Sequence, residues 1–126
     1  MLVEYRNVRQ IDGEGYRRWF SDDYFDLIVW YEGSRRSHRG ISGFQLCYDR
    51  TGYERALTWQ RGRGFSHEKV DPGEEGRLGL KSTPILVADG VFDAGAIADR
   101  FREASRGMDP QIAELVLDRL AQYPGG

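Results

Sequence analysis

The sequence has few of the residues that disulfide frameworks and metal sites need. Its 126 residues include one cysteine, Cys47, and two histidines, His38 and His67. A single cysteine excludes a disulfide within the chain, and two histidines without ligand spacing give little basis for a zinc site. Cys47 falls in a stretch with strand periodicity, where a small packing residue is a more common role than a reactive thiol.

Long apolar runs and a strong net charge are also lacking. No stretch approaches the length of a transmembrane helix, and residues 1–6 lack the apolar core of a signal peptide. We therefore expect a cytoplasmic chain with no membrane partner. The formal net charge at pH 7 is -2, so any electrostatic function must come from local groups of charges.

Lysine is scarce as well, since Lys69 and Lys81 are the only two among 18 basic residues. The planar guanidinium of arginine binds phosphate or carboxylate through two parallel hydrogen bonds. A biased base composition of the genome would give the same excess of arginine. The excess by itself therefore carries little weight for function.

The strongest pattern present is the alternation of apolar and polar residues between positions 25 and 70. In residues 25–32 it predicts a strand. Ile28 and Trp30 make the second face partly apolar too, which is typical of a central strand covered at least partly on both sides. Residues 44–49, 53–60 and 65–70 repeat the pattern, with turns at 49–52 and 61–64. The apolar face of the first strand consists of Phe25, Leu27, Val29 and Tyr31.

Two more strands are predicted ahead of this stretch. Residues 2–9 alternate weakly, and neither face is cleanly apolar. Residues 16–20 suit a short strand or a helical turn, and we favour a strand because it extends the meander. After residue 83, Pro84 opens a short apolar run at 84–87 that suits a strand or an extended segment.

The last third of the chain predicts two helices. Asp93 is a good N-cap for a helix over residues 94–106, and Asp109 caps a second helix with Pro110 at its first position. The link Gly107-Met108 is short, so the two helices should form a hairpin. We expect one α+β domain over residues 1–126, in which an antiparallel β-meander sheet has a C-terminal helical hairpin packed on one face.

A meander places alternate connections at the same end of its sheet, and this predicts a separation of charge. Loops 10–15, 33–42 and 61–64 fall at one end. Turns 21–24, 49–52 and 71–76 fall at the other, with acidic residues Asp22, Asp23, Asp49, Asp71, Glu74 and Glu75. The first end gathers the candidate anion-binding residues Arg35, Arg36, His38, Arg39, Arg61 and Arg63.

Arginines on neighbouring loops can bind phosphate, carboxylate or a nucleic-acid backbone, and an aromatic residue such as Tyr31 could stack a base. The more common explanation is that such charges are only solvated surface. Pairing of the two oppositely charged ends would also permit self-association. The three tryptophans, Trp19, Trp30 and Trp59, could likewise have a packing role or a ligand-stacking role. Tryptophan on a sheet belongs more often to a core or a dimer interface than to a stacking platform.

Motifs for nucleotide cofactors fail on spacing. Residues 79–83 (Gly-Leu-Lys-Ser-Thr) lack an adjacent Gly-Lys pair, and they continue into Pro84 instead of a helix. Gly62-Arg63-Gly64 has no third glycine, because His67 stands in its place. We therefore expect no cofactor.

Two functions remain. The first is a non-catalytic binding or interaction module, acting as a homodimer or on an anionic ligand or protein partner, with nucleic acid as one unproven candidate. The alternative is a small enzyme that uses His67 with Glu68 or Asp71. Neighbouring strand residues such as His67 and Glu68 point to opposite faces, so a buried, hydrogen-bonded His67 is the more common case. The sequence thus favours the binding module.

Overall fold

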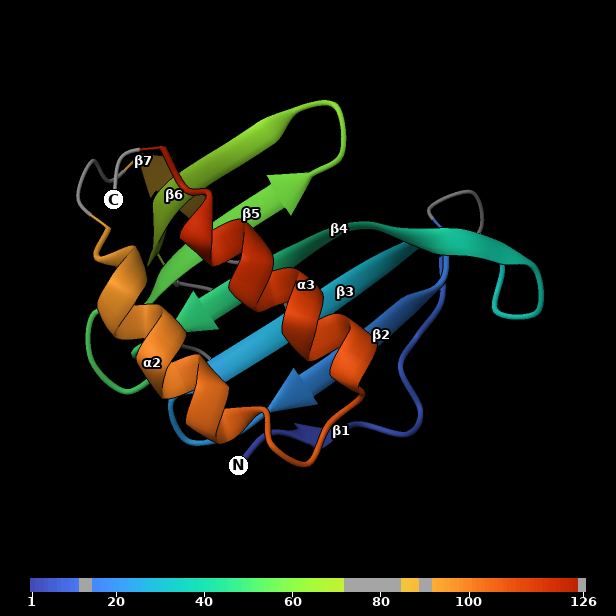
Figure 1. The fold of residues 1–126 in the computed structure, drawn as a ribbon, viewed down its shortest axis with the longest axis horizontal. Helices are drawn as coiled ribbons and strands as arrows, with labels where there is room; N and C mark the ends of the chain where they lie inside the picture. The colour runs from blue at the N-terminus through green and yellow to red at the C-terminus, as the bar shows by residue number, and fades with distance from the viewer. Residues whose placement is uncertain (12–14, 72–84, 89–91, 125–126) are drawn as a thin grey trace.

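A computed structural model describes residues 1–11, 15–71, 85–88 and 92–124 of the chain. At its centre is a seven-stranded antiparallel sheet in which each strand pairs with the next one in the sequence (Figure 1). The predicted meander is confirmed. The elements are β1 (Val3–Glu4), β2 (Arg17–Ser21), β3 (Phe25–Gly33), β4 (His38–Tyr48), β5 (Arg55–Gln60), β6 (Gly64–Asp71), β7 (Ile85–Ala88), α2 (Ala94–Ala104) and α3 (Pro110–Ala121).

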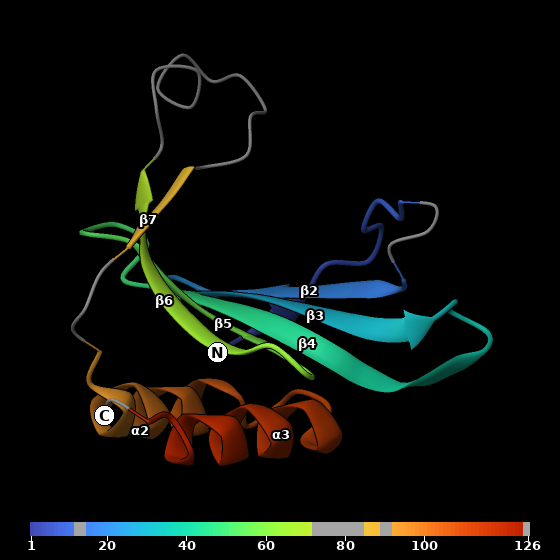
Figure 2. The same cartoon turned by 90° about the horizontal axis from the view of Figure 1, so that it is seen from above.

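The two helices cover one face of the sheet, and no helix of the described residues lies on the other (Figure 2). Each begins at the predicted N-cap. The Asp93 side chain accepts the backbone N–H of Ala96 at 3.0 Å, and the Asp109 side chain accepts that of Gln111 at 2.9 Å. These bonds satisfy donors that a helix start leaves unpaired. The α+β fold with a helical hairpin on one face is therefore confirmed.

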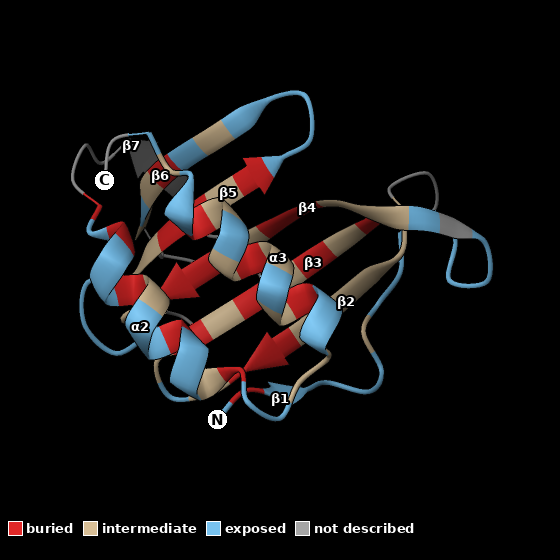
Figure 3. Ribbon diagram, in the orientation of Figure 1, coloured by how far each residue is buried: buried red, intermediate tan, exposed pale blue. Residues whose placement is uncertain are grey.

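The core lies between the sheet and the helices (Figure 3). Alternation sends every second residue of β3 into it, and Leu27 is 0% exposed, as is its β4 partner Leu46. Phe101 from α2 and Val116 from α3 close the core from the other side, also at 0% exposure. Burying one such side chain contributes about 1.5–3 kcal/mol, so this layer determines which way the sheet faces.

Most predicted strand boundaries are within two residues of the observed ones, and two differ by more. β4 begins at His38 instead of residue 44, because the predicted loop 33–42 continues the hairpin with β3, where Tyr31 pairs with Ile41 and Gly33 with His38. This end of the hairpin needs no apolar face, so alternation does not reveal it. β1 covers only Val3–Glu4 instead of residues 2–9.

Part of the predicted acidic end cannot be placed. Of the turn at 71–76, Asp71 ends β6, and residues 72–76, with Glu74 and Glu75, lie outside the described residues. Separately, none of the helices in the described ranges is long and apolar enough to cross a membrane.

Gly43 lies where β4 and β5 approach each other closely. A Cβ atom at this position would be 2.6 Å from the carbonyl oxygen of Trp59, which is much closer than real Cβ contacts. The clash is with backbone, so relief requires a shift of the strand. A Cβ at Gly95, in the first turn of α2, would meet only Asp93 Oδ1, at 3.8 Å.

Substituting these two glycines tests the close approach. Gly43→Ala should lower the free energy of unfolding by about 1–3 kcal/mol, because the strand pair must open. Gly95→Ala should leave it unchanged or raise it by at most about 1 kcal/mol, because alanine favours a helix. Urea unfolding followed by circular dichroism measures both, and a Gly43→Ala variant as stable as the original chain would contradict the close approach.

Candidate functional site

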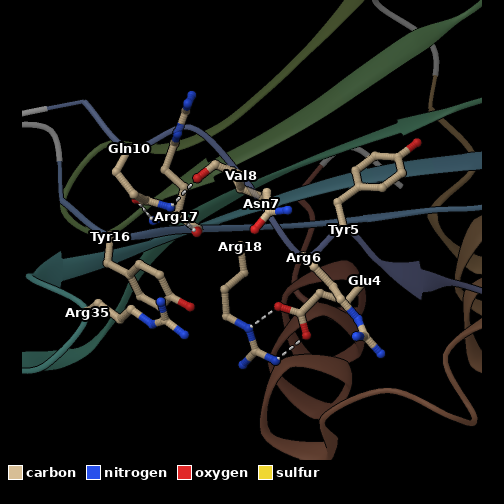
Figure 4. Close-up of a pocket in the computed structure, with 10 residues that line it drawn as sticks. All are labelled: Glu4, Tyr5, Arg6, Asn7, Val8, Gln10, Tyr16, Arg17, Arg18 and Arg35. Atoms are coloured by element: carbon tan, nitrogen blue, oxygen red, sulfur yellow. Dashed lines mark hydrogen bonds and ion pairs between the residues drawn. The ribbon is translucent and has the colours of Figure 1, made fainter.

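A pocket of about 710 Å³ lies along the β2 edge of the sheet (Figure 4). This volume is within the range of small-molecule sites. Three parts of the chain line it: the segment that follows β1, the start of β2, and the turn between β3 and β4. The lining residues are Glu4, Tyr5, Arg6, Asn7, Val8, Gln10, Tyr16, Arg17, Arg18 and Arg35.

The pocket lies between two attachments of the N-terminal segment to β2. At the first, the Tyr5 N–H donates to the Trp19 carbonyl oxygen at 2.9 Å. At the second, the Gln10 side chain acts like the backbone of a neighbouring strand. Its Nε2 donates to the Arg17 carbonyl oxygen at 2.9 Å, and its Oε1 accepts the Arg17 N–H at 2.8 Å. Residues 6–8, between the attachments, form one wall of the pocket.

The charge of the pocket is opposite to that of the chain. Among the residues that the structure describes, the lining holds four arginines and one glutamate, which sum to a formal charge of +3, whereas the whole chain carries -2. Polar side chains complete most of the wall. The site therefore concentrates positive charge locally, as the near-neutral composition requires of any electrostatic function.

Arg18 has a structural role in this pocket. Its guanidinium donates to both carboxylate oxygens of Glu4 at 2.8 Å, to Asp109 at 3.1 Å and to the Tyr31 hydroxyl at 3.3 Å. The hydrogen bonds with Glu4 are the main reason why the pKa of Arg18 is raised, so it stays charged. Because Asp109 is the N-cap of α3, Arg18 ties the pocket edge to the helix layer. Arg18 thereby pairs with Glu4, the one carboxylate among the described lining residues.

The other three guanidinium groups have no such partner. Arg17 donates from Nε, at 3.2 Å, and from Nη2 to the Arg9 carbonyl oxygen, which fixes its position without neutralising its charge. Within the described part of the chain, Arg6, Arg17 and Arg35 form no ion pair. Unneutralised guanidinium groups lining one pocket suit an oxyanion ligand.

One residue of the predicted arginine cluster lines this pocket, namely Arg35. Arg36 shares its exposed turn, and Arg39 is exposed on β4. His38 is the first residue of β4, and its side chain lies outside the description.

The remaining two, Arg61 and Arg63, belong to the β5–β6 turn, which lies apart from the β3–β4 turn in both views (Figures 1 and 2). Arg61 Nη2 donates to the Ile41 carbonyl oxygen at 2.8 Å, alongside β4. The residues of the predicted cluster are thus divided between the β3–β4 hairpin and the β5–β6 turn.

The sequence did not indicate Arg6 and Arg17 as site residues. A strand expected over residues 2–9 left no room for a pocket at this edge. The available signal was the density of arginine on both sides of the predicted loop at 10–15, where Arg6, Arg9, Arg17 and Arg18 occur within thirteen positions. Tyr31, suggested for stacking a base, is instead buried on the helix side.

His67 lies on the helix side of the sheet and is 7% exposed. Its Nε2 and the Tyr48 hydroxyl oxygen are hydrogen-bonded at 2.6 Å, and the two rings are stacked. Glu68 pairs with Ala56 and faces the opposite side. His67 and Glu68 are therefore divided between the faces, and the side chain of Asp71, the other carboxylate of the enzyme alternative, lies outside the described part of the structure. The described side chains include no group of three or more metal-ligating residues.

Cys47 lies on the helix-free face beside two carboxylates. Burial raises the pKa of its thiol from 9.0 to about 12, and the charges of Glu54 and Asp26 add to this effect. Burial also raises the pKa of Glu54. A thiol of this kind has little thiolate at neutral pH, which suits the packing role expected from the sequence.

Alkylation kinetics test the environment of Cys47. A pKa raised from 9.0 to about 12 lowers the thiolate fraction at pH 8 by about a thousandfold, and burial restricts access further. Iodoacetamide should therefore modify the native chain far more slowly than the urea-unfolded chain, as measured by mass spectrometry. Similar rates in the two states would contradict a buried, protonated thiol.

Comparison of the chain with protein-family models, with curated proteins and with solved structures finds no match.

Proposed function

We propose that this chain is a non-catalytic binding module for a phosphate-bearing anion, and that the ligand occupies the arginine pocket at the β2 edge. The observation that carries the proposal is a set of three guanidinium groups, from Arg6, Arg17 and Arg35, at one pocket of a net acidic chain. None of the three forms an ion pair with any residue that the structure describes. Positive charges gathered at one pocket repel one another when the pocket is empty. A bound anion offsets this repulsion and is held by charged hydrogen bonds.

The number of arginines favours a multiply charged ligand. One guanidinium is enough to pair with a monocarboxylate, whereas the lining has a formal charge of +3. A chain of two or three phosphate groups offsets that charge. Its oxygens also match the paired N–H groups of arginine, and neutral hydrogen bonds from Tyr5 and Asn7 can orient it.

The chemistry of the pocket supports binding over catalysis. A general base must be free to take a proton, and Glu4, the one carboxylate among the described lining residues, is held by Arg18 through two hydrogen bonds. The outlying basic residues would raise the rate at which an anion reaches the pocket. They are Arg36, His38 and Arg39 in the β3–β4 hairpin and Arg61 and Arg63 in the β5–β6 turn.

Calorimetric titration with inorganic tripolyphosphate tests the proposal. The chain should bind it at low salt, and the affinity should fall as salt rises. Arg6→Gln and Arg35→Gln should each weaken binding by about tenfold or more, because each removes charged hydrogen bonds. The matched control is Arg102→Gln on α2, where the arginine is exposed and pairs with Asp99, and this variant should bind like the original chain.

Two outcomes would count against the pocket. Absence of tripolyphosphate binding at low salt would refute the proposed site. A loss of affinity in Arg102→Gln equal to that in the pocket variants would show that binding depends only on the net charge of the chain. Arg63→Gln adds a test of the β5–β6 turn. Unchanged affinity in that variant would confine the site to the β2 edge, whereas a loss would extend it along the hairpin.

A further inference from the structure

We propose that the anion is the backbone of a single-stranded nucleic acid, and that its bases stack on the helix-free face of the sheet next to the pocket. This extension rests on the proposed function. It adds a second part of the site, centred on Trp30, that a free phosphate chain would not use.

Arg17 connects the two parts. Figure 4 shows Arg17 and Arg18 directed to opposite sides of β2, and Arg18 is the one that reaches α3. Arg17 pairs with Trp30 across the β2–β3 ladder, so their side chains are neighbours on the helix-free face. Trp19, which pairs with Ile28, lies on that face diagonally from Trp30. A basic pocket and two tryptophans therefore adjoin each other.

The β4 position beside Trp30 carries no side chain. It is Gly43, whose partner on β5 is the exposed Gln60, which in turn pairs with Gly64. A Cβ atom at Gly43 would lie 3.3 Å from Gln60 Cγ, so the nearest side chain beyond the glycine is flexible and exposed. A partly exposed ring with a glycine beside it can accept a base in parallel contact, which is worth about 1–3 kcal/mol per base.

The next row across the sheet supplies hydrogen-bonding groups. Gln45, Thr58 and Ser66 follow Ile28 in register on the same face, and Gln45 Nε2 donates to Thr58 Oγ1 at 3.1 Å. Amide and hydroxyl groups of this kind can contact the edges of unpaired bases. A face built for a second protein layer would instead be expected to carry large apolar residues at these positions.

The charges fix how the strand would lie. Arg6, Arg17 and Arg35 are at the β2 edge, whereas the far row of the same face holds Asp26 and Glu68. Phosphates are attracted to the first group and repelled by the second. The backbone should therefore follow the β2 edge, with the bases extending over β3 toward β4.

The three tryptophans give an optical readout. Trp59 is 7% exposed on the helix side, where the Arg119 guanidinium lies 4.6 Å from its ring centroid. Trp19 is held by its indole N–H, which donates to Asp26, and by edge contact with Tyr5. Trp30 is the one beside Arg17. Base stacking should quench its fluorescence, and tripolyphosphate should not.

The experiment compares three ligands: inorganic tripolyphosphate, a short single-stranded RNA of about eight nucleotides, and a duplex of the same sequence. Fluorescence anisotropy and tryptophan quenching are recorded for the original chain, Trp30→Leu, Trp30→Phe and Arg35→Gln. The control is Tyr53→Leu, which removes an aromatic ring that is 81% exposed in the β4–β5 connection.

The expected result separates the two parts of the site. Trp30→Leu should weaken RNA binding by about 5- to 100-fold and abolish the quenching, with tripolyphosphate affinity unchanged. Trp30→Phe should retain part of the RNA affinity that Trp30→Leu loses. Arg35→Gln should weaken the binding of both RNA and tripolyphosphate, and Tyr53→Leu should weaken the binding of neither. The duplex should bind without quenching, because its bases are already stacked.

Each contrary result has a distinct meaning. Tripolyphosphate binding together with RNA affinity that is unaffected in Trp30→Leu, or is matched by the duplex, would overturn the stacking site and leave the proposed function standing. Failure of both ligands to bind would overturn both. A dimer in light scattering that blocks RNA and is lost in Trp30→Leu would assign the face to a second copy of the chain and overturn this inference.

Discussion

Consecutive residues of a strand must point to opposite faces of the sheet, and this constraint organises the whole molecule. It sends Leu27 into the core and leaves Trp30 on the face that carries no described helix. It also separates Arg17 from Arg18, so that one arginine faces outward while its neighbour binds the start of α3. The division of labour between adjacent residues follows from backbone geometry and needs no special motif.

The fold could be predicted because its signals are local and repeat along the chain. Alternation in residues 25–32 identifies a strand and its buried face, and Asp93 and Asp109 identify helix starts through bonds to backbone only two or three residues away. The part of the sheet that the sequence pattern did not predict is the polar start of β4. Residues 38–42 are held by ladder bonds to β3, and Ile41 packs against the edge of the core, so their composition gives little sign of a strand.

The candidate site was harder to predict because it depends on contacts between distant residues. Arg6 and Arg35 line one pocket although two strands, β2 and β3, separate them in sequence. Arg35 was anticipated from the meander, since topology places its turn at a known end of the sheet. Arg6 was not, because its position depends on where β1 ends and on one glutamine side chain, and neither has a periodic signature.

The Gln10 side chain also affects how readily the sheet edge can aggregate with other chains. An outer strand with free N–H and C=O groups is a template on which other chains can add strands and aggregate. At Arg17 both groups are already occupied by the Gln10 amide, which imitates a strand but cannot itself be extended. The same side chain that bounds the pocket therefore closes the sheet to further growth at this point.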